Sequence, residues 1–308
     1  MSIKVIIGIA TYNGAERVKL LLSSIDNYTS EEEKKNLFVV VCDDGTPYKE
    51  NNKKLDLICS KYDVYRIYHK INKGISATWN TLSQATNSDL IILLNDDIQI
   101  SHPFWLRNLI YFFEHNDNIG HVSYPILQMD PRTGMPKIGY EIPNINCLPQ
   151  FSMTPGGQAF AFRREVYNKL EMGFREELKS FYEETFMGYE VSQSGYYSYI
   201  LSFPALQHFS SQTFAQNEEL AFTVPDYNLS MEKYKELLSP KFPPEKIEPK
   251  PGKAYRMEYS RVLFALHWGC KDIFDQPQNE VEEKLKHKFF PKLIRWIDYN
   301  NNERKLLI

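Results

Sequence analysis

Short apolar runs alternate with amphipathic segments over the first hundred residues, and this alternation constrains the fold more than any other feature. The apolar runs are short enough to be strands buried on both faces, and they cover residues 3–10, 37–42, 64–69 and 90–94. The segments between them have helical spacing, at residues 15–28, 53–60 and 75–85. This order predicts an α/β fold, with a mostly parallel sheet and crossover helices on its faces.

The pattern loosens after residue 101. We expect helices at residues 103–115, 164–170 and 185–194, and strands at residues 121–126, 159–163 and 197–201. Residues 128–155 are rich in Pro, Gly and Asn, which is typical of a loop or hairpin. Five prolines within residues 240–251 predict a linker. Amphipathic spacing then predicts helices at residues 255–267 and 279–300, the second interrupted by Pro291.

Charge and cysteine content exclude several classes of protein. The formal net charge of −3 argues against a nucleic-acid partner, which needs a basic face. The four cysteines, Cys42, Cys59, Cys147 and Cys270, are scattered without metal-site spacing, so we expect reduced and mostly buried thiols. No apolar run approaches the roughly 20 residues of a membrane span, and the first residues lack a signal-peptide pattern. These features predict a cytoplasmic protein.

The C-terminal part of the chain differs in charge from the rest. Residues 231–308 contain 16 basic and 12 acidic side chains, whereas the whole chain is acidic. A basic helical tail can contact anionic lipid, so peripheral attachment at the inner face of a membrane is one expectation. A packed helical cap with a solvated basic face is the other.

Two adjacent carboxylates, Asp96 and Asp97, follow the apolar run at residues 90–94. A buried ionised carboxylate must be paired, hydrogen-bonded or bound to a metal. In an open α/β sheet, ligands bind beyond the carboxyl ends of the strands. The two acids therefore suit a divalent cation that also holds a phosphate-bearing ligand, although a solvated acidic turn would give the same sequence.

Polar motifs follow all four predicted strands. They are Ala10-Thr11-Tyr12-Asn13, Asp43-Asp44-Gly45-Thr46, Asn72-Lys73-Gly74 with Asn80 shortly after, and Asn95-Asp96-Asp97. In this order they resemble the nucleotide-sugar-binding half of a family 2 glycosyltransferase of the A type (GT-A). The second half continues the resemblance through residues 155–160, the acidic pair Glu183-Glu184, Gly195-Tyr196 and His208. The likeness extends over about residues 3 to 215.

The resemblance implies a GT-A-like, Rossmann-type, mostly parallel sheet flanked by helices, with a C-terminal helical extension. Residues 1–100 would form the nucleotide-sugar-binding half of the domain, residues 101–230 the acceptor-binding and catalytic half, and residues 231–308 a linker and helical extension. The implied activity is inverting, metal-dependent transfer of one sugar from a nucleotide-sugar donor to a hydroxyl of a glycan or lipid-linked acceptor, as in polysaccharide biosynthesis.

The resemblance also assigns a set of residues to the nucleotide sugar. They are Ala10, Thr11, Tyr12, Asn13, Asp43, Asp44, Asn72, Lys73, Gly74, Asn80, Asn95 and Asp96. Asp44 would face the base, because a carboxylate accepts a hydrogen bond from a base N–H, while Asp43 would bond its own turn. Asp96 would lie near the ribose. Asn80 could equally cap or cross-link loops.

Metal binding and catalysis fall to four other positions of the resemblance. Asp97 and His208 are the expected metal ligands, and the imidazole favours Mn²⁺ over Mg²⁺. The cation would neutralise the diphosphate leaving group. Glu184 is the expected general base for the acceptor hydroxyl, with Glu183 as the alternative, since a helix N-terminus tends to keep a carboxylate ionised. Direct attack by that hydroxyl inverts the anomeric centre.

Departures from the family pattern keep alternatives open. Asn95 replaces the usual first acid and Glu184 the commoner Asp, which leaves room for a catalytically weak or inactive sugar-nucleotide-binding protein. A sugar-nucleotide nucleotidyltransferase would need a Gly-rich basic loop where residues 11–17 stand. Residues 292–296 end in Arg-Trp, like a motif of processive synthases, but lack its Gln and a following span. We interpret them as a helix face of a non-processive enzyme.

Overall fold

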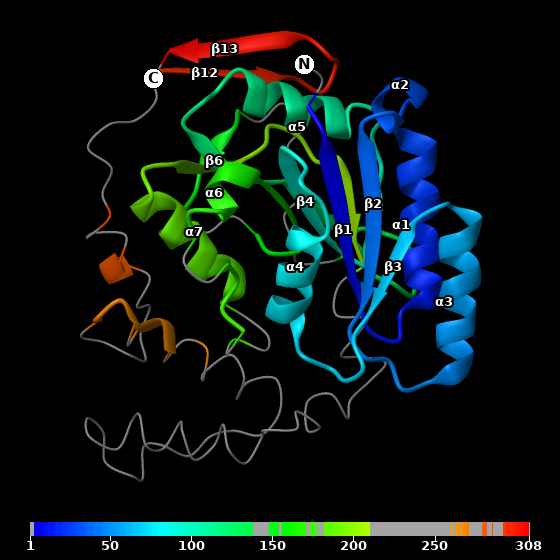
Figure 1. Ribbon diagram of the computed structural model, residues 1–308. Coiled ribbons are helices and arrows are strands. Elements are labelled where there is room, and N and C mark those ends of the chain that lie inside the picture. Colours follow the sequence, from blue (N-terminus) through cyan, green and yellow to red (C-terminus); the bar gives the residue numbers. More distant parts are fainter. Residues whose placement is uncertain are drawn as a thin grey trace.

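The chain folds as a large sheet with helices on both faces (Figure 1). The computed structural model describes residues 3–137, 148–153, 156–170, 173–176, 178, 182–209 and 292–307, together with 260, 263–265, 267–270, 279–281 and 285. The predicted linker at residues 240–251 and Cys147 lie outside these residues, as does most of the predicted helix at 255–267.

The sheet has eight strands in the order β3-β2-β1-β4-β9-β6-β10-β8. In that order they are β3 (Tyr65–Tyr68), β2 (Leu37–Asp43), β1 (Val5–Thr11), β4 (Leu90–Asn95), β9 (Ala159–Arg163), β6 (Ile119–Ser123), β10 (Tyr197–Ile200) and β8 (Gln150–Phe151). The first four are mutually parallel, and β9 runs antiparallel to both β4 and β6. The predicted parallel sheet is therefore confirmed, and the carboxyl ends of β1, β2 and β4 lie side by side.

Helices form a layer on each face of the sheet. One layer holds α1 (Ala15–Tyr28), α3 (Lys49–Lys61) and α5 (Trp105–Glu114), and the other holds α4 (Ile75–Gln84), α6 (Arg164–Tyr167) and α7 (Glu183–Gln193). A short helix, α2 (Glu31–Lys34), follows α1 and begins with a capping box at Ser30. Along β1, Ile7 and Ile9 pack against the first layer, whereas Ile6 packs against the second. Burial on both faces explains why the strands are apolar throughout.

A second, smaller sheet was not anticipated from the sequence. It contains β5 (Ile98–Ile100), β11 (Leu206–His208) and β7 (Ile126–Gln128), in the order β5-β11-β7. β5 begins directly after the acidic pair that ends β4, and its Ile98 pairs with His208 of β11. The backbone register thus brings two segments that are far apart in the sequence to one point, and this determines the position of the metal candidates described below.

The expected helix at residues 279–300 is wrong over its last part. Residues 293–297 form β12 (Leu293–Ile297), which pairs antiparallel with β13 (Glu303–Leu307). Burial alternates over the middle of β12, where Ile294 and Trp296 are buried while Arg295 is exposed, and Ile297 at its end is buried as well. The stretch following Pro291 is short and rich in branched and aromatic side chains, which favours a strand.

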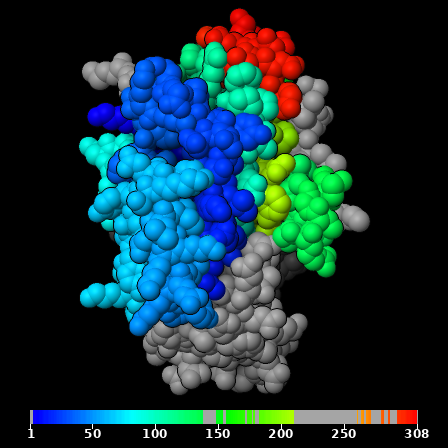
Figure 2. All heavy atoms as spheres, turned by 90° about the vertical axis from the view of Figure 1, so that its right-hand side faces the viewer, coloured from blue at the N-terminus to red at the C-terminus, as the bar shows by residue number. Residues whose placement is uncertain are grey.

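The hairpin of β12 and β13 packs against α5, at the end of the sheet opposite the carboxyl ends of β1 and β2 (Figure 1). The Asn116 side chain bonds both the N–H and the carbonyl of Arg295, as a neighbouring strand would. The space-filling view shows the hairpin in red at that end of the molecule (Figure 2). The Arg-Trp sequence therefore lies in a strand that covers the apolar layer around α5. The helix face that we expected at residues 292–296 is wrong.

The described thiols are buried, as expected. Cys42, Cys59 and Cys270 all lie in the interior. Burial raises the pKa of Cys42 to about 12 and that of Cys59 to about 11, so both stay protonated near neutrality. Among the described helices, none is both long and apolar enough to cross a membrane.

His121 on β6 makes stability depend on pH. It is fully buried, lies edge-on to Phe160, and its Nε2 has no hydrogen-bond partner among the described residues. Burial lowers the pKa of His121 to about 3. The folded protein therefore binds fewer protons than the unfolded chain below the ordinary histidine pKa of about 6.5. The free energy of unfolding should fall as the pH falls from there toward 3.

We expect this one residue to remove about 2 kcal/mol of stability between pH 7.5 and pH 5. Urea unfolding of the wild type and of His121→Gln at several pH values measures the effect, and the variant should show a shallower pH dependence. His115, an exposed histidine at the end of α5, provides the matched control H115Q. Parallel pH profiles of the wild type and H121Q would contradict the assignment.

Candidate active site

The polar motifs meet at one edge of the sheet. Thr11 at the end of β1 pairs with Asp43 of β2, and Ala10 pairs with Asn95 of β4. The backbone N–H of Asp44 also donates to the carbonyl of Thr11, at 2.9 Å. The first, second and fourth motifs of the sequence therefore line one edge, where an open α/β sheet binds its ligands.

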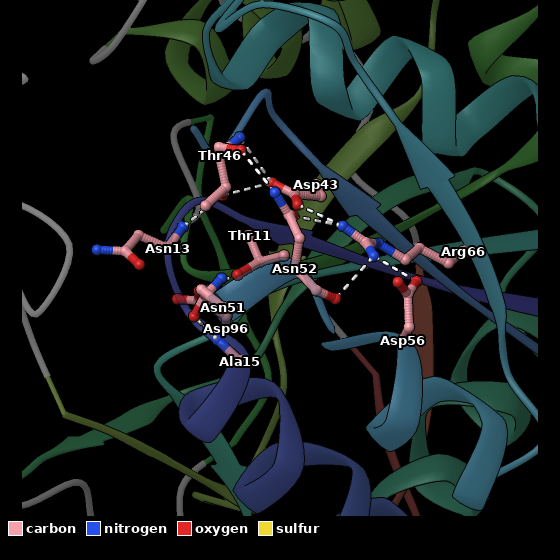
Figure 3. Close-up of polar contacts among 10 residues, drawn as sticks. All are labelled: Thr11, Asn13, Ala15, Asp43, Thr46, Asn51, Asn52, Asp56, Arg66 and Asp96. Carbon is pink, nitrogen blue, oxygen red and sulfur yellow. Dashed lines mark hydrogen bonds and ion pairs between the residues drawn. The ribbon is translucent and has the colours of Figure 1, made fainter. Parts of the chain in front are cut away.

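Asp43 holds the turn that follows β2 (Figure 3). Its Oδ1 accepts from the N–H of Thr46 at 3.1 Å and from the Thr46 hydroxyl at 2.6 Å, the turn role expected from the sequence. Its Oδ2 pairs with Arg66 at 2.7 Å. Thr46 in turn accepts from the N–H of Asn13, at 2.8 Å. Asp43 is completely buried, so it shapes the loops around a donor and offers no free atom to one.

Asp44 anchors the third motif. Its Oδ1 accepts from the N–H of Lys73 at 2.8 Å, and its Oδ2 from the N–H of Gly74 at 2.9 Å. His69 Nδ1 lies 2.9 Å from the same Oδ1. Gly74 precedes α4 and has a φ of 94°, which a side chain would strain. The carboxylate thus fixes the backbone of the loop at residues 72–74, which the resemblance assigned to the donor.

Asn80 takes the cross-linking role that the sequence left open. Its Nδ2 donates to the carbonyl of Phe174 at 2.7 Å, and its Oδ1 accepts from the N–H of the same residue at 2.8 Å. Tyr167 donates a further hydrogen bond to Oδ1, at 3.2 Å. The amide is saturated inside the protein, so Asn80 joins α4 to the loop at residues 173–176 instead of presenting a group to ligand.

Asp96 is held by a buried cation. Arg17 of α1 forms a bidentate pair with it, with Nε to Oδ1 and Nη2 to Oδ2 both at 3.0 Å. The hydroxyl of Thr11 donates to Oδ2 at 2.6 Å (Figure 3). Gly14 leaves room for this contact, because a Cβ there would lie 2.0 Å from Oδ2. Burial raises the pKa of Asp96, and Arg17 opposes that shift.

This pairing changes what Asp96 offers to a ligand. Both of its oxygens are already bonded, and its exposure is only 4%. Arg17 also compensates the charge of Asp96. Among the described residues, Asp97 forms no ion pair with a lysine or an arginine. Asp96 therefore ties β4 to the turn between β1 and α1, close to the expected ribose position.

Asp97 and His208 face each other. His208 Nε2 lies 3.3 Å from Asp97 Oδ1, yet this buried oxygen has no hydrogen-bond partner among the described residues. His208 Nδ1 lies 2.9 Å from Gln128 Oε1, an acceptor, so the ring hydrogen belongs on Nδ1. The lone pair of Nε2 then points toward the carboxylate oxygen. Two unbonded acceptors held this close suit a shared cation.

The chemistry of these two donors fits a divalent metal. A neutral imidazole and a carboxylate together suit Mn²⁺ better than Mg²⁺. A metal-binding histidine usually donates its other ring N–H to an oxygen acceptor, as His208 Nδ1 does to Gln128 Oε1. Within the described residues, no group of three or more potential ligands occurs. The remaining coordination positions would fall to phosphate oxygens and water.

The acidic pair Glu183-Glu184 opens α7, after Tyr182 in a left-handed conformation with a φ of 67°. Glu183 is 7% exposed and its Oε2 has no partner among the described residues. Burial raises the pKa of Glu183 well above its usual range, and the charge of Glu184 adds to this. Burial also raises the pKa of Glu184, against the expected effect of the helix N-terminus. Burial therefore favours one negative charge on the Glu183-Glu184 pair over two.

Glu184 connects to the edge of β4 through the loop before β9. A Cβ on Gly157 would lie 2.9 Å from both Cγ and Cδ of Glu184, so the loop passes directly against this side chain. The next residue, Gln158, accepts from the N–H of Asn95 at 3.0 Å. The Asn95 Oδ1 is buried without a partner in the described structure. Glu184 and the acids after β4 therefore flank the same short loop.

Several residues that shape the site carried no recognisable sequence signal. Arg17, Arg66, His69 and Gln128 each bond a residue of the motifs, but they lie on α1, β3, the end of β3 and β7. Isolated arginines and histidines are common on protein surfaces. Only the tertiary contacts distinguish these four from others in the chain.

Comparison with known proteins identifies the family of the chain. The family model of glycosyl transferase family 2 matches residues 6–171, which is more than half of the chain. The chain belongs to this family. Membership confirms the expected family and fold and makes the protein a glycosyltransferase. No curated protein sequence matches the chain significantly.

Solved structures of two other proteins have a similar fold. TarS of S. aureus, residues 1–349 in complex with UDP, superposes with a TM-score of 0.55 at 13% identity, covering 94% of this family 2 chain and 93% of that chain. The mannosyltransferase PcManGT from Pyrobaculum calidifontis, in complex with GDP-Man and Mn²⁺, gives 0.53 at 13% identity, with coverage of 94% and 77%. Against another TarS structure the chain spans only 41% of the neighbour's length. These likenesses establish the fold.

Proposed function

We propose that this family 2 glycosyltransferase is inverting and metal-dependent, and that it transfers one sugar from a nucleotide-sugar donor to a hydroxyl of a glycan or lipid-linked acceptor. The observation that carries the proposal is Asp97 Oδ1, which is buried without a hydrogen-bond partner in the described part of the chain and faces His208 Nε2 at 3.3 Å. Bound there, Mn²⁺ would act as a Lewis acid toward the diphosphate leaving group. The Mn²⁺ in the PcManGT complex supports this choice of metal.

The donor would lie along the edge formed by the motif residues. Asp44 and the backbone around Thr11 would contact the base and ribose, and the loop at residues 72–74 would line the same region. The GDP-Man and UDP-GlcNAc complexes of the structural neighbours support a sugar nucleotide as donor. Asp43, Asn80 and Asp96 would act by holding the surrounding loops, because their polar atoms are already bonded.

Glu184 would take the proton of the acceptor hydroxyl. Its position against Gly157, next to the loop that bonds Asn95, places a carboxylate on the side of the site away from β2. The raised pKa of Glu184 makes it a stronger base once it is ionised. A single displacement by the activated hydroxyl inverts the anomeric configuration, and the diphosphate leaves with its charge neutralised.

The composition of the chain bears on the acceptor and the cellular setting. Hydroxyl-rich glycans of polysaccharide biosynthesis suit a chain with 20 Tyr and 19 Phe, since aromatic faces stack on sugars. The basic composition of residues 231–308 supports a cytoplasmic enzyme that touches the inner face of a membrane where lipid-linked acceptors are held.

Release of nucleoside diphosphate tests the proposal. Purified enzyme with UDP-, GDP- and dTDP-sugars and a panel of saccharide acceptors should release the nucleoside diphosphate in Mn²⁺, lose that activity in EDTA, and regain it when Mn²⁺ is restored. Full turnover in EDTA would contradict metal dependence. In a separate assay with a nucleoside triphosphate and a sugar 1-phosphate, release of pyrophosphate would point instead to a nucleotidyltransferase.

Removing either protein ligand should have the same effect as chelation. Asp97→Asn and His208→Gln are each expected to lower turnover at least about 100-fold, because the metal supplies several kcal/mol of transition-state stabilisation. Isothermal titration with Mn²⁺ and UDP should show weaker metal binding in both variants. Asp26→Asn, which removes an exposed surface carboxylate, serves as the matched control. Normal turnover in D97N would place the metal elsewhere.

A further inference from the structure

We propose that His69 is a positioning residue that fixes Asp44 as the acceptor for a nucleobase, and that this makes the donor site select bases carrying a ring N–H. The inference rests on the proposed donor site. It concerns the pair of His69 and Asp44 at the ends of β3 and β2, and no motif in the sequence points to this histidine.

His69 is clamped on every side. Its exposure is 6%, its backbone N–H donates to the carbonyl of Asp43, and its Nδ1 lies 2.9 Å from Asp44 Oδ1. On the other side, Nε2 lies 3.0 Å from the hydroxyl of Thr81 in α4. The ring therefore spans from β2 to the second turn of α4.

The direction of the hydrogen bond follows from its partner. An ionised carboxylate only accepts, so Nδ1 of His69 carries the hydrogen and donates to Asp44. The other ring nitrogen, Nε2, then accepts from the hydroxyl of Thr81, which uses its single hydrogen in this bond. Because both ends of the ring are held, His69 cannot rotate away, and Asp44 is fixed in a single orientation.

The hydrogen bonds of Asp44 show what a ligand can use. Oδ1 accepts from His69 and from the N–H of Lys73, which fills both of its lone pairs. Among the described residues, Oδ2 accepts only from the N–H of Gly74, so one acceptor position remains. Asp44 is 6% exposed, and a ligand that closes over it must satisfy that position or leave it buried and unpaired.

A fixed carboxylate acceptor distinguishes between bases. Uracil and hypoxanthine present a ring N–H beside a carbonyl, which can donate to Oδ2. Cytosine and adenine present a bare ring nitrogen at the equivalent place, whose lone pair would face the carboxylate. A site that hydrogen-bonds an N–H rejects an analogue that lacks it, because the buried group is then left unpaired. Without His69, Asp44 could rotate, and the discrimination should fall.

Binding of two matched nucleotide pairs tests the inference. Dissociation constants for UDP and CDP, and for IDP and ADP, are measured by titration calorimetry in Mn²⁺ with the wild type and with His69→Leu. If the enzyme accepts pyrimidines, the wild type should bind UDP at least about tenfold tighter than CDP. If it accepts purines, the same should hold for IDP over ADP. H69L should reduce that ratio to near one, mainly by weakening the N–H-bearing partner.

Two further variants separate positioning from folding. His69→Asn keeps an N–H near the position of Nδ1 and should retain most of the wild-type ratio. Thr81→Val removes the hydroxyl that holds the far side of the ring and should give an intermediate ratio, which keeps the test valid even if H69L does not fold. In turnover assays, H69L should raise the donor KM with little change in kcat.

The contrary outcomes are distinguishable. Equal weakening of all four nucleotides by H69L and T81V, with the ratio preserved, would reject the role of His69 while leaving the proposed function intact. Wild-type affinities that do not differ within either pair would also reject it. Failure of all four nucleotides to bind would overturn both the inference and the proposed donor site.

Discussion

Replacing Glu184 with Gln is expected to lower turnover by about 10²–10⁴-fold while leaving nucleotide binding near the wild-type level. Glutamine has the same shape but cannot take a proton from the acceptor hydroxyl. The proposed donor contacts involve the ends of β1, β2 and β4 and do not include this side chain, so affinity for UDP or GDP should persist. Steady-state kinetics together with calorimetric titration of the nucleotide measures both quantities.

Glu183→Gln provides the matched control. Burial and the neighbouring charge raise the pKa of Glu183 well above its usual range, which favours its neutral form, and an amide resembles a neutral carboxyl group. E183Q should therefore lose far less activity than E184Q. A large loss in E183Q with an active E184Q would exchange the two roles and assign the base to Glu183.

The pH dependence gives a second readout of the same residue. Since burial raises the pKa of Glu184, the base should be protonated and inactive at a pH where an ordinary glutamate, with a pKa of about 4.3, is already ionised. The acidic limb of kcat/KM should accordingly lie above that value, with activity rising as the pH rises. E184Q should lack this limb.

Replacing Arg17 with Met should destabilise the fold by about 3–5 kcal/mol, because it leaves the charge of Asp96 buried without its partner. The two side chains are 11% and 5% exposed, and Arg17 makes two hydrogen bonds of 3.0 Å to the carboxylate. Equilibrium unfolding in urea at pH 7.5 measures the loss. Lys19→Met, which removes a half-exposed cation from the same helix, is the control.

A double variant identifies the cause of that loss. R17M combined with Asp96→Asn removes the buried charge together with its partner, while the amide can still accept from Thr11. The double variant should regain most of the stability lost in R17M. If R17M and R17M/D96N are equally unstable, packing of the arginine stem would account for the loss, and the ion pair would contribute little.

The fold was largely predictable because its signals are local. Apolar runs bounded by turns fixed β1, β2, β3 and β4, and the helical spacing of residues 15–28 matches α1 at both ends. Short strands in the second half were harder to foresee. β5 and β11 contain three residues each, and their existence depends on pairing with each other across a long separation.

The C-terminal hairpin also shows that local spacing does not decide secondary structure by itself. Residues 279–300 have a spacing that fits a helix, yet residues 293–297 are a strand. Residues 293–297 adopt the strand conformation because α5 offers them an apolar surface and because Asn116 bonds Arg295 as a neighbouring strand would. Local spacing could not include either partner.

The sequence by itself determined which strand ends carry polar residues, and hence that the acids, the amides and His208 belong to one family pattern. Tertiary structure alone decided how each is used: Arg17 neutralises Asp96, His69 clamps Asp44, and Gln128 orients His208 toward Asp97. The physical reason is range. Hydrophobic periodicity reports burial over a few residues, whereas the state of a buried charge depends on partners brought close only by folding.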